Sequence, residues 1–526
     1  MTPRATSAIN DRTSRPVEPG VGRRWRGLWT CGTGSSVRRL RARVRRWGAR
    51  HHGRRMERRR GRPRSCAAGE RSGRDSRASA AAIVRLPPVP AIRPFRALRY
   101  SPEVVPDLAA VVAPPYDVID ASLRRRLAAR DARNIVHVDL PVDEPGDLED
   151  ERYRRAAHLL AAWRGDGTLH RDPRPAVYPY EQVYAVPGTD RRVSRRGVFA
   201  RVVLEPLSAG GGVRAHERTL SGPKEDRYKL LRATNVNTSP VVGMYEDPSG
   251  TVPSLLERGT AGAPIAAVTD DDGVEHRLWA MPGGHDEAGA ATAELCAAIG
   301  RSPITLADGH HRYETALRYA SERRTGHVLE DEPAWGQILM LLLEPVAGPL
   351  TVLATHRVLL GLDEAAVDRF VAGLPELFEI QRDVPREALL AQFGPASGGG
   401  NEGRFGFWTR HGGAILDARR VAFERWLPPG GEALRRLDVT LVGVALERLA
   451  GLDPEAIAGG ERLAYTRDAA EAIDWVAGGS ASAALLLQPT PASAILAVAA
   501  EGDVMPQKST YIYPKALTGL VINPLE

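Results

Sequence analysis

The sequence predicts an α+β protein: a multi-lobed body with a mixed β-sheet, preceded by a disordered basic arm. Three observations support this class. Across residues 88–526, segments that alternate like strands are interspersed with segments of helical periodicity. Residues 1–87 show no such periodicity and are rich in arginine. A chain of 526 residues is also long enough for about two to four domains.

The arm, residues 1–87, holds 24 arginines, no lysine and five acidic residues, so its net charge is +19. Because the whole chain carries +8, the body carries −11. A segment with so few apolar residues cannot bury enough surface to become ordered. The arm fits a tail for nucleic acid or anionic surfaces, an organellar transit peptide, or translated sequence upstream of the natural start. We favour the last, with a start near Ile83 or later, because Ile92–Tyr100 is typical of a native N-terminus.

The first predicted lobe, residues 88–246, alternates strands and helices. Asn134–Leu140 alternates apolar and polar residues and is predicted to form a strand. Leu148–Trp163 places its large apolar residues on one helical face. Two further strands are predicted at residues 176–186 and 198–207.

The second predicted lobe, residues 247–393, contains a polar turn between a strand and a helix. The predicted elements are a strand at 274–281, a helix at 287–299, a strand at 304–307, a helix at 313–324 and buried sheet within 336–361.

A glycine-rich linker at 394–403 separates this lobe from the C-terminal lobe, residues 404–526. The C-terminal lobe is predicted to form helices at 432–449 and 468–476 and strands at 483–488 and 494–500, and then to return to the site.

Lysine is scarce in this chain, with four lysines against 68 arginines. Lys224 and Lys229 lie in one short segment, and Lys508 and Lys515 lie in another. Where a general positive charge suffices, the chain uses arginine, so its lysines indicate a need for a compact ammonium group. Together with the polar turn, these segments predict a site for a phosphate-bearing ligand.

The polar turn is Asp308-Gly309-His310-His311-Arg312. A glycine between strand and helix permits positive φ and close approach to a ligand, and the helix N-terminus attracts phosphate. We expect Arg312 to contact phosphate oxygens, and His310 or His311 to donate a hydrogen bond or move a proton. Asp308 suits a helix cap, a magnesium ligand or a base. The alternative is an ordinary surface helix that Asp308 caps.

The first lysine segment begins with His216-Glu217 and continues into a helix that starts at Ser221. Lys224 opposes the dipole at the start of this helix, and a bound anion would remove the conflict. The basic residue in the next turn, Arg227, is assigned to the same phosphate site. His216 and Glu217 resemble a proton-transfer pair, with Glu217 as the base for a substrate hydroxyl; the alternative is a solvated loop.

Lys229 has a simpler role, because Glu225 lies four residues before it and can pair with it along the helix. The second lysine segment, Pro506–Gly519, places Lys508 and Lys515 among hydroxyl-bearing residues. We expect these two lysines to bind phosphate or carboxylate; the alternative is an edge strand protected by lysines. In Val111–Ile119, consecutive prolines hold the backbone extended, which suits Asp117 either to a structural turn, the interpretation we favour, or to the rim of the site.

The body contains one cysteine, Cys296, so it has neither a disulfide framework nor a cysteine zinc site, which fits a cytoplasmic protein. No set of metal-ligating side chains is predicted. No apolar run is long enough for a membrane span. The fingerprints of P-loop, dinucleotide-binding and protein-kinase folds are absent from the sequence.

Five strings resemble a conserved bacterial family of unknown function, number 1015 in the series of uncharacterised domains. They are Pro94–Tyr100, Ala113–Asp117, His216–Thr234, Ala307–Leu317 and Pro506–Gly519. The string Gly309-His-His-Arg312, followed by Ala316, is similar to the phosphate-binding turn and helix of the ParB/sulfiredoxin fold. The resemblance therefore implies a ParB-like strand-turn-helix element in this chain.

One branch of that fold, the free serine kinases, shares an Asp-Gly-His-x-Arg string. In that branch the Asp and His lie around the transferred phosphate, which implies such roles for Asp308 and His310, with Arg312 beside them. A separate glutamate activates the serine hydroxyl there. No string of this chain aligns with that glutamate, and Glu217 is our own assignment.

These inferences predict a phosphotransferase that acts on a small hydroxyl metabolite such as L-serine, with Mg²⁺ and ATP, ADP or pyrophosphate as donor. The alternatives are a ParB-like nucleotide-binding regulatory or DNA-associated protein and a non-catalytic nucleotide sensor. The acidic body argues against nucleic acid as a partner. A small molecule is the expected partner, no membrane is expected, and oligomerisation is left open.

Overall fold

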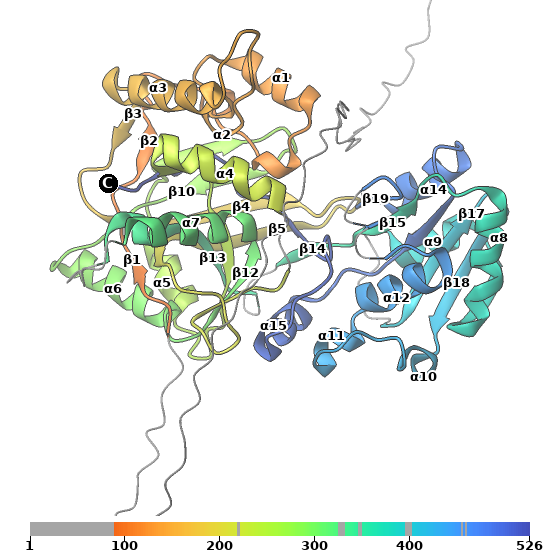
Figure 1. Cartoon of the computed structure of the whole chain (residues 1–526). Coiled ribbons are helices and arrows are strands. Elements are labelled where there is room, and N and C mark those ends of the chain that lie inside the picture. The colour runs from red at the N-terminus through yellow and green to blue at the C-terminus, as the bar shows by residue number, and fades with distance from the viewer. Residues whose placement is uncertain are drawn as a thin grey trace, which may run out of the picture.

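The computed structural model describes residues 89–217, 221–324, 332–345, 350–394, 402–453, 456–457 and 460–526. The expected arm, residues 1–87, and most of the expected linker at 394–403 lie outside the described residues. Figure 1 shows a larger lobe on the left and a smaller lobe on the right. Each lobe combines a sheet with helices, so the predicted α+β class with a mixed sheet is confirmed.

The larger lobe is built on a ten-stranded mixed sheet with the order β6-β12-β8-β13-β5-β4-β10-β9, to which β1 and β11 add at β5 and β4. Its strands are β1 (Ile92–Arg93), β4 (Ala176–Ala185), β5 (Arg192–Val203), β6 (Val213–Arg214), β8 (Val241–Met244), β9 (Ala266–Thr269), β10 (Glu275–Leu278), β11 (Met281–Pro282), β12 (Ile304–Asp308) and β13 (Gln337–Leu343). The expected division at residue 246 runs through this sheet, because β8 pairs with both β12 and β13.

Both faces of the large sheet are covered, and β13 consequently reads as an unbroken apolar run after Gln337. On one face, Ile338 and Met340 pack with residues of four helices, α4 (Ser221–Thr234), α5 (Val252–Gly259), α6 (Glu287–Ile299) and α7 (His310–Arg323). On the other face, Leu339 and Leu341 pack with apolar residues of the C-terminal tail, including Leu517. The tail is therefore part of the core of the larger lobe.

A helical layer with its own core lies beside this sheet and comprises α1 (Ala121–Arg130), α2 (Val136–Asp139) and α3 (Glu151–Gly165). The prediction of a strand at Asn134–Leu140 was wrong, because this segment forms α2. The side chain of Asn134 accepts a hydrogen bond from the backbone N–H of Val136 at 3.0 Å and donates to the carbonyl of Ala110 at 2.7 Å. These bonds give the backbone a local alternative to a strand ladder.

The smaller lobe contains an antiparallel sheet with the order β16-β18-β17-β20-β15-β19. Its strands are β15 (His356–Leu359), β16 (Phe378–Val384), β17 (Arg404–Thr409), β18 (Gly412–Ala418), β19 (Leu463–Thr466) and β20 (Ala483–Leu486). Helices α9 (Arg386–Phe393) and α14 (Ala469–Ala477) pack on one face, and α8 (Glu364–Gly373) and α12 (Asp438–Ala450) pack on the other.

The predicted strand at 494–500 was wrong, because this segment lies in α15 (Ala492–Glu501). Its buried side chains are Ile495, Val498 and Ala499, which follow the spacing of one helical face. A short apolar run without polar alternation fits either period, and tertiary packing selected the helix.

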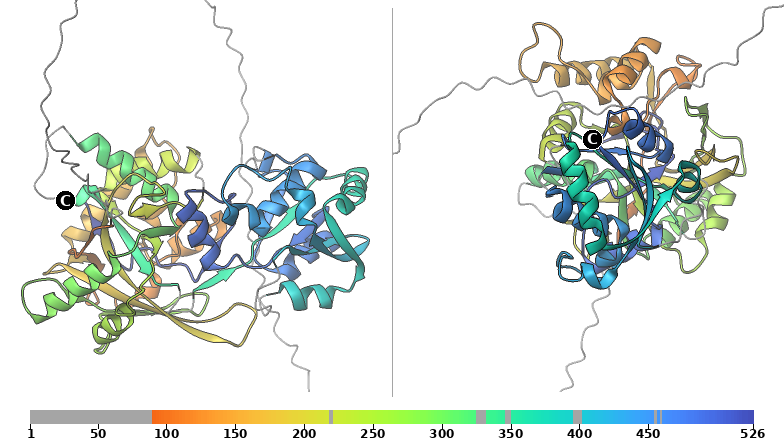
Figure 2. Two further views of the ribbon diagram at one scale, coloured as in Figure 1. Left: turned by 90° about the horizontal axis from the view of Figure 1, so that it is seen from below. Right: turned by 90° about the vertical axis from the view of Figure 1, so that its right-hand side faces the viewer.

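After α15 the chain leaves the smaller lobe and crosses the larger one. β21 (Tyr511–Tyr513) pairs with β14 (Thr351–Leu353), and β22 (Asn523–Pro524) pairs with β7 (Val236–Asn237). The left view of Figure 2 shows this tail passing from the smaller lobe to a C-terminus on the larger lobe. Within the described residues, no helix combines the length and the apolar character needed to cross a bilayer.

Candidate active site where the tail meets the β12–α7 turn

The polar turn lies at the end of β12, and the strand, turn and helix form as predicted. Gly309 precedes α7 with φ at +88°, in the left-handed region that favours glycine. A Cβ atom at this position would also lie 3.0 Å from the side chain of Arg312. The N-cap of the helix is Gly309 rather than Asp308, so the helix has no side-chain cap bond. The turn is therefore not the ordinary capped surface helix of the alternative interpretation.

Asp308 instead forms a largely buried ion pair with Lys515 from the tail. Lys515 Nζ lies 2.9 Å from Asp308 Oδ2, and the two side chains are 12% and 16% exposed. Arg312 adds a second positive charge at 3.8 Å from the same oxygen. Burial alone would raise the pKa of Asp308, but Lys515 and Arg312 outweigh burial and hold that pKa well below its ordinary range. Asp308 is therefore a carboxylate at neutral pH.

Two polar side chains of the large sheet hold the backbone around Lys515. Arg195, on β5, donates to the carbonyls of Tyr513 at 3.0 Å and Pro514 at 2.7 Å, and also to the side chain of Gln182. Gln182, on β4, donates to the carbonyl of Lys515 at 3.0 Å. We did not predict these residues from the sequence. The available signal was a long polar side chain within a strand that is paired with a neighbouring strand on each side.

Two neutral histidines lie next to the ion pair. The rings of His216 and His310 are 4.6 Å apart, and the backbone N–H of His216 donates to His310 Nε2 at 3.4 Å. Burial lowers the pKa of His216 to about 4 and that of His310 well below its ordinary value. Both rings are therefore uncharged at neutral pH and act as oriented hydrogen-bonding groups.

Glu217 follows His216 and reaches the second lysine segment. Its Oε1 accepts a hydrogen bond from the backbone N–H of Lys508 at 3.3 Å. Burial raises the pKa of Glu217 to about 7, and the nearby charge of Lys508 only partly offsets this rise. A carboxyl group with this pKa exchanges a proton readily near neutral pH, as general acid–base catalysis requires.

The smaller lobe completes the surroundings of Glu217. The guanidinium of Arg357, on β15, is buried and donates to the carbonyl of Lys508 at 3.5 Å. Burial lowers the pKa of Arg357, and the negative charge of Glu217 offsets part of this shift. Burial raises the pKa of Tyr465, and the charge of Glu217 adds to that rise. The site therefore contains groups from both lobes, and Arg357 and Tyr465 are contributors that the sequence did not reveal.

Lys224 and His311 lie on neighbouring helices beside the cluster described above. This cluster consists of His216, Glu217, Asp308, His310, Lys508 and Lys515. Lys224 Nζ forms an ion pair with Glu314 of α7 at 2.5 Å. Burial lowers the pKa of His311, and the charges of Lys224 and Lys508 lower it further. Residues of the two lysine segments and of the turn therefore meet at one place.

The two predicted phosphate-binding arginines already have protein partners. Arg312 donates to Ser239 Oγ at 3.1 Å and to the carbonyl of Pro240. Arg227 is buried, pairs with Asp226 at 2.6 Å and lies 4.3 Å above the ring of Tyr116. Arg312 contributes charge next to Asp308, whereas Arg227 is paired with Asp226 and stacked on the ring of Tyr116.

Asp117 is closer to the site than the sequence indicated. It lies in a single 3-10 turn, Tyr116–Val118, and its charge raises the pKa of Lys515, whose largest influences are burial and Asp308. Asp117 Oδ1 is buried and has no hydrogen-bond partner within the described part of the chain. Such an oxygen is costly unless a ligand or ion satisfies it.

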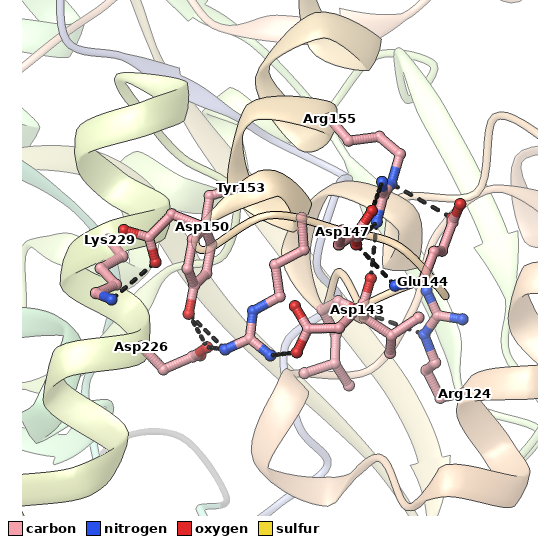
Figure 3. Close-up of polar contacts among 12 residues, drawn as sticks. Arg124, Asp143, Glu144, Asp147, Asp150, Tyr153, Arg155, Asp226 and Lys229 are labelled. Atoms are coloured by element: carbon pink, nitrogen blue, oxygen red, sulfur yellow. Dashed lines mark hydrogen bonds and ion pairs between the residues drawn. The ribbon is translucent and has the colours of Figure 1, made fainter.

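Lys229 does not belong to the cluster. It forms an ion pair with Asp150 at 2.7 Å, while Glu225, its predicted partner, pairs with Arg318 instead. The predicted pairing was wrong because the acidic loop before α3 lies closer to the lysine. Figure 3 shows this pair beside a network of Asp, Glu and Arg side chains.

Two surface hollows, of about 380 Å³ and 350 Å³, contain none of the cluster residues. Among the described residues, no group of three His, Cys, Asp or Glu side chains is placed to hold a metal ion. A magnesium ion that arrives with phosphates needs only one or two protein carboxylates. Asp308, which is ionised, and Asp117, which has an unsatisfied oxygen, are the residues suited to that task.

Comparisons with solved structures give only weak similarities. A free serine kinase in complex with AMP has a TM-score of 0.31 and 12% identity, over 63% of this chain and 92% of that chain. A conserved hypothetical protein from Pyrococcus furiosus has a TM-score of 0.29 and 12% identity, over 60% and 90%. SbnI from Staphylococcus aureus, truncated at its C-terminus, has a TM-score of 0.30 and 11% identity, over 61% and 87%. Similarities this weak say nothing about the reaction.

No curated protein sequence matches this chain. A family model described as a protein of unknown function, DUF1015, matches residues 92–440. The match covers most of the larger lobe and much of the smaller one, and the tail that carries Lys508 and Lys515 lies beyond it. The resemblance to this family is thereby confirmed, and the chain belongs to the DUF1015 family.

Proposed function

We propose that this protein is a phosphotransferase that moves a phosphoryl group from a nucleotide or pyrophosphate to the hydroxyl of a small metabolite, with free L-serine as the first candidate. One observation carries the proposal. Glu217, whose pKa is about 7, lies beside Lys508 and within electrostatic reach of Asp308 and Lys515. A base poised near neutral pH thus adjoins the cations that phosphates require.

The lysines and the turn supply the positive side of this site. Phosphoryl transfer needs positioned charge and little covalent chemistry from the protein. Lys224 and Lys508 flank His311 at the start of α7, where the positive end of the helix dipole also attracts anions. Lys515 is held in place and keeps Asp308 ionised. The three lysines and the N-terminus of α7 together offset the charge of a phosphate chain.

The carboxylates divide the remaining tasks. Asp308 and Asp117 would hold Mg²⁺, which when bound offsets charge between the phosphates of the donor. Glu217 takes the proton from the acceptor hydroxyl as that oxygen forms its bond to phosphorus, while the bond from that phosphorus to the bridging oxygen of the donor breaks and the remainder of the donor leaves. His216 and His310, both neutral, orient oxygen atoms by hydrogen bonds.

The test uses the full-length protein with Mg²⁺, each of ATP, ADP and pyrophosphate, and a panel of hydroxy acids and hydroxy amino acids. Phosphorus NMR should detect a new phosphate ester. Glu217→Gln should lower the rate by about 10²- to 10⁴-fold, the usual contribution of a general base. Glu225→Gln is the matched control, because Glu225 pairs with Arg318 on the exterior and should leave the rate unchanged.

The absence of any ester with every donor and acceptor would contradict the proposal. Nucleotide binding without turnover, measured by thermal shift, would support the regulatory alternative instead. A salt-dependent interaction with DNA would support the DNA-associated alternative.

A further inference from the structure

A threonine hydroxyl in the tail is aligned with the imidazole of His216. Thr510 Oγ1 lies 3.1 Å from His216 Nε2, and Thr510 is half-buried. The other ring nitrogen, Nδ1, contacts the backbone carbonyl of Leu306 on β12. The function proposed above uses Glu217 as its base and needs neither Thr510 nor His216 in that role.

The carbonyl of Leu306 determines the tautomer of the ring. A carbonyl oxygen only accepts hydrogen bonds, so Nδ1 must carry the proton and Nε2 must present a lone pair. The hydrogen bond to Thr510 therefore runs from the hydroxyl to the imidazole. A hydroxyl that donates to a base, which a third group orients, is the arrangement of an activated nucleophile.

The position of the pair places it beside the phosphate-binding groups. The His216 ring packs against His310 of the turn at 4.6 Å, and the charges of Asp308 and Lys515 both affect the pKa of His216. Thr510 lies in the tail between Lys508 and Lys515. A phosphoryl group bound at this turn would therefore lie near the Thr510 hydroxyl.

The neighbouring hydroxyl, Ser509, provides an internal contrast. Its Oγ donates to the carbonyl of Pro506 at 2.5 Å, so its proton goes to a backbone oxygen rather than to a base. Ser509 is also buried, at 3% exposure. Ser509 and Thr510 are adjacent, but of the two only Thr510 donates its hydroxyl proton to a base, which is the feature that activates a hydroxyl.

We propose that Thr510 is a covalent phosphoryl acceptor and that its phosphothreonine is an intermediate of the reaction. This inference rests on the proposed function. Thr510 Oγ1 forms a bond to the transferred phosphorus, the bond from that phosphorus to the bridging oxygen of the donor breaks, and the hydroxyl proton passes to His216 Nε2. With ATP as the donor, ADP leaves.

A second transfer completes the cycle. The hydroxyl oxygen of the metabolite attacks the phosphorus while Glu217 takes its proton, and Thr510 Oγ1 leaves and recovers a proton from His216. A neutral imidazole is sufficient for the first step, because the loose transition state of phosphoryl transfer demands little proton removal before the phosphorus–oxygen bond breaks.

The experiment incubates the full-length protein with Mg²⁺ and ATP labelled in its terminal phosphate, without an acceptor metabolite. Peptide mass spectrometry should locate one phosphothreonine, at Thr510, and addition of the acceptor should remove the label. Thr510→Val keeps the shape of the side chain and should abolish labelling, whereas Thr510→Ser should retain it. Ser509→Ala should be labelled like the wild-type protein.

His216→Asn tests the orienting base and should slow labelling by about 100-fold. A melting curve checks that Thr510→Val is folded. If this folded variant transfers phosphate to the metabolite at the wild-type rate, the intermediate does not exist and the proposed function stands. If the wild-type protein forms neither phosphothreonine nor phosphate ester with any donor, both proposals fail. Label on a residue other than Thr510 in the wild-type protein also overturns the inference.

Discussion

Two of the four lysines form ion pairs of similar length in very different surroundings. Lys515 lies 2.9 Å from Asp308, with side chains that are 12% and 16% exposed. Lys229 lies 2.7 Å from Asp150, with side chains that are 32% and 42% exposed. Figure 3 shows the second pair between α3 and α4, and the first lies at the junction of the turn and the tail.

The difference shows that separation alone does not determine the role of an ion pair. Exposed pairs gain little, because water and salt screen them and two long side chains lose freedom. A buried pair is screened far less, and removing one partner leaves a charge without compensation. Lys515 also lies 4.5 Å above the ring of Tyr511. Lysine therefore forms an exposed ion pair at the surface in one region and part of the candidate active site in the other.

The largest expected effect is that of Lys515→Met. It leaves the Asp308 carboxylate buried without its ammonium partner, and we expect a loss of about 3–5 kcal/mol in the free energy of unfolding, measured by urea denaturation at pH 7. The control is Lys515→Met combined with Asp308→Asn, which should recover much of this loss. A loss below about 1 kcal/mol would place this pair in the class of Lys229.

The same pair has a pH signature. Since the pKa of Asp308 lies below its ordinary value of 3.8, the unfolded chain binds the proton more readily, and wild-type stability should fall as the pH drops below about 4. Lys515→Met should weaken this dependence.

Glu217 sharpens the comparison, because it is a partly buried carboxylate whose contact with Lys508 is through the backbone N–H. Its pKa rises from an ordinary 4.5 to about 7, so the folded protein binds the proton more tightly and stability falls as the pH rises between these values. Glu217→Gln should therefore be more stable than the wild type at pH 8, by up to about 3 kcal/mol.

In the same variant, the rise of phosphotransferase rate with pH, centred near pH 7 in the wild type, should disappear. A variant that is no more stable than the wild type at pH 8, and whose rate keeps its pH profile, would show that Glu217 is solvated and is not the base.

Arg195 tests whether the position of Lys515 depends on the sheet beneath it. Arg195→Lys removes the planar fork that donates to the carbonyls of Tyr513 and Pro514, and we expect a loss of about 1–3 kcal/mol from carbonyls left unsatisfied. The turnover rate should fall while the affinity for a donor, measured by calorimetry, changes less. Equal changes in both would indicate general damage rather than a displaced Lys515.

The smallest effect should come from Lys229→Met. Its ion pairs, with Asp150 at 2.7 Å and Glu149 at 3.9 Å, are exposed, so we expect a melting temperature and an activity within the error of the wild-type values. A marked loss of either would show that the exposed region contributes to the site after all.

Much of the fold and some of the candidate site could be predicted from sequence. Strong patterns, such as the helix after Gly309 and the buried strands around residues 176–203 and 337–343, appear in the structure. The scarcity of lysine indicated the two segments that meet at the turn. The predicted strands at 134–140 and 494–500 were wrong. In the first segment the side chain of Asn134 makes local hydrogen bonds that compete with a strand ladder. In the second, which is short and apolar, packing rather than periodicity decides between helix and strand.

What the sequence by itself determined is local: the glycine that a left-handed turn requires, the helix that begins after it, and the ammonium groups available to bind an anion. The tertiary structure decided which of those groups act together. It placed Lys515 against Asp308, more than two hundred residues away, and left Lys229 at the surface. Burial sets the strength of a charge interaction, and burial depends on how distant segments pack, which no local pattern encodes.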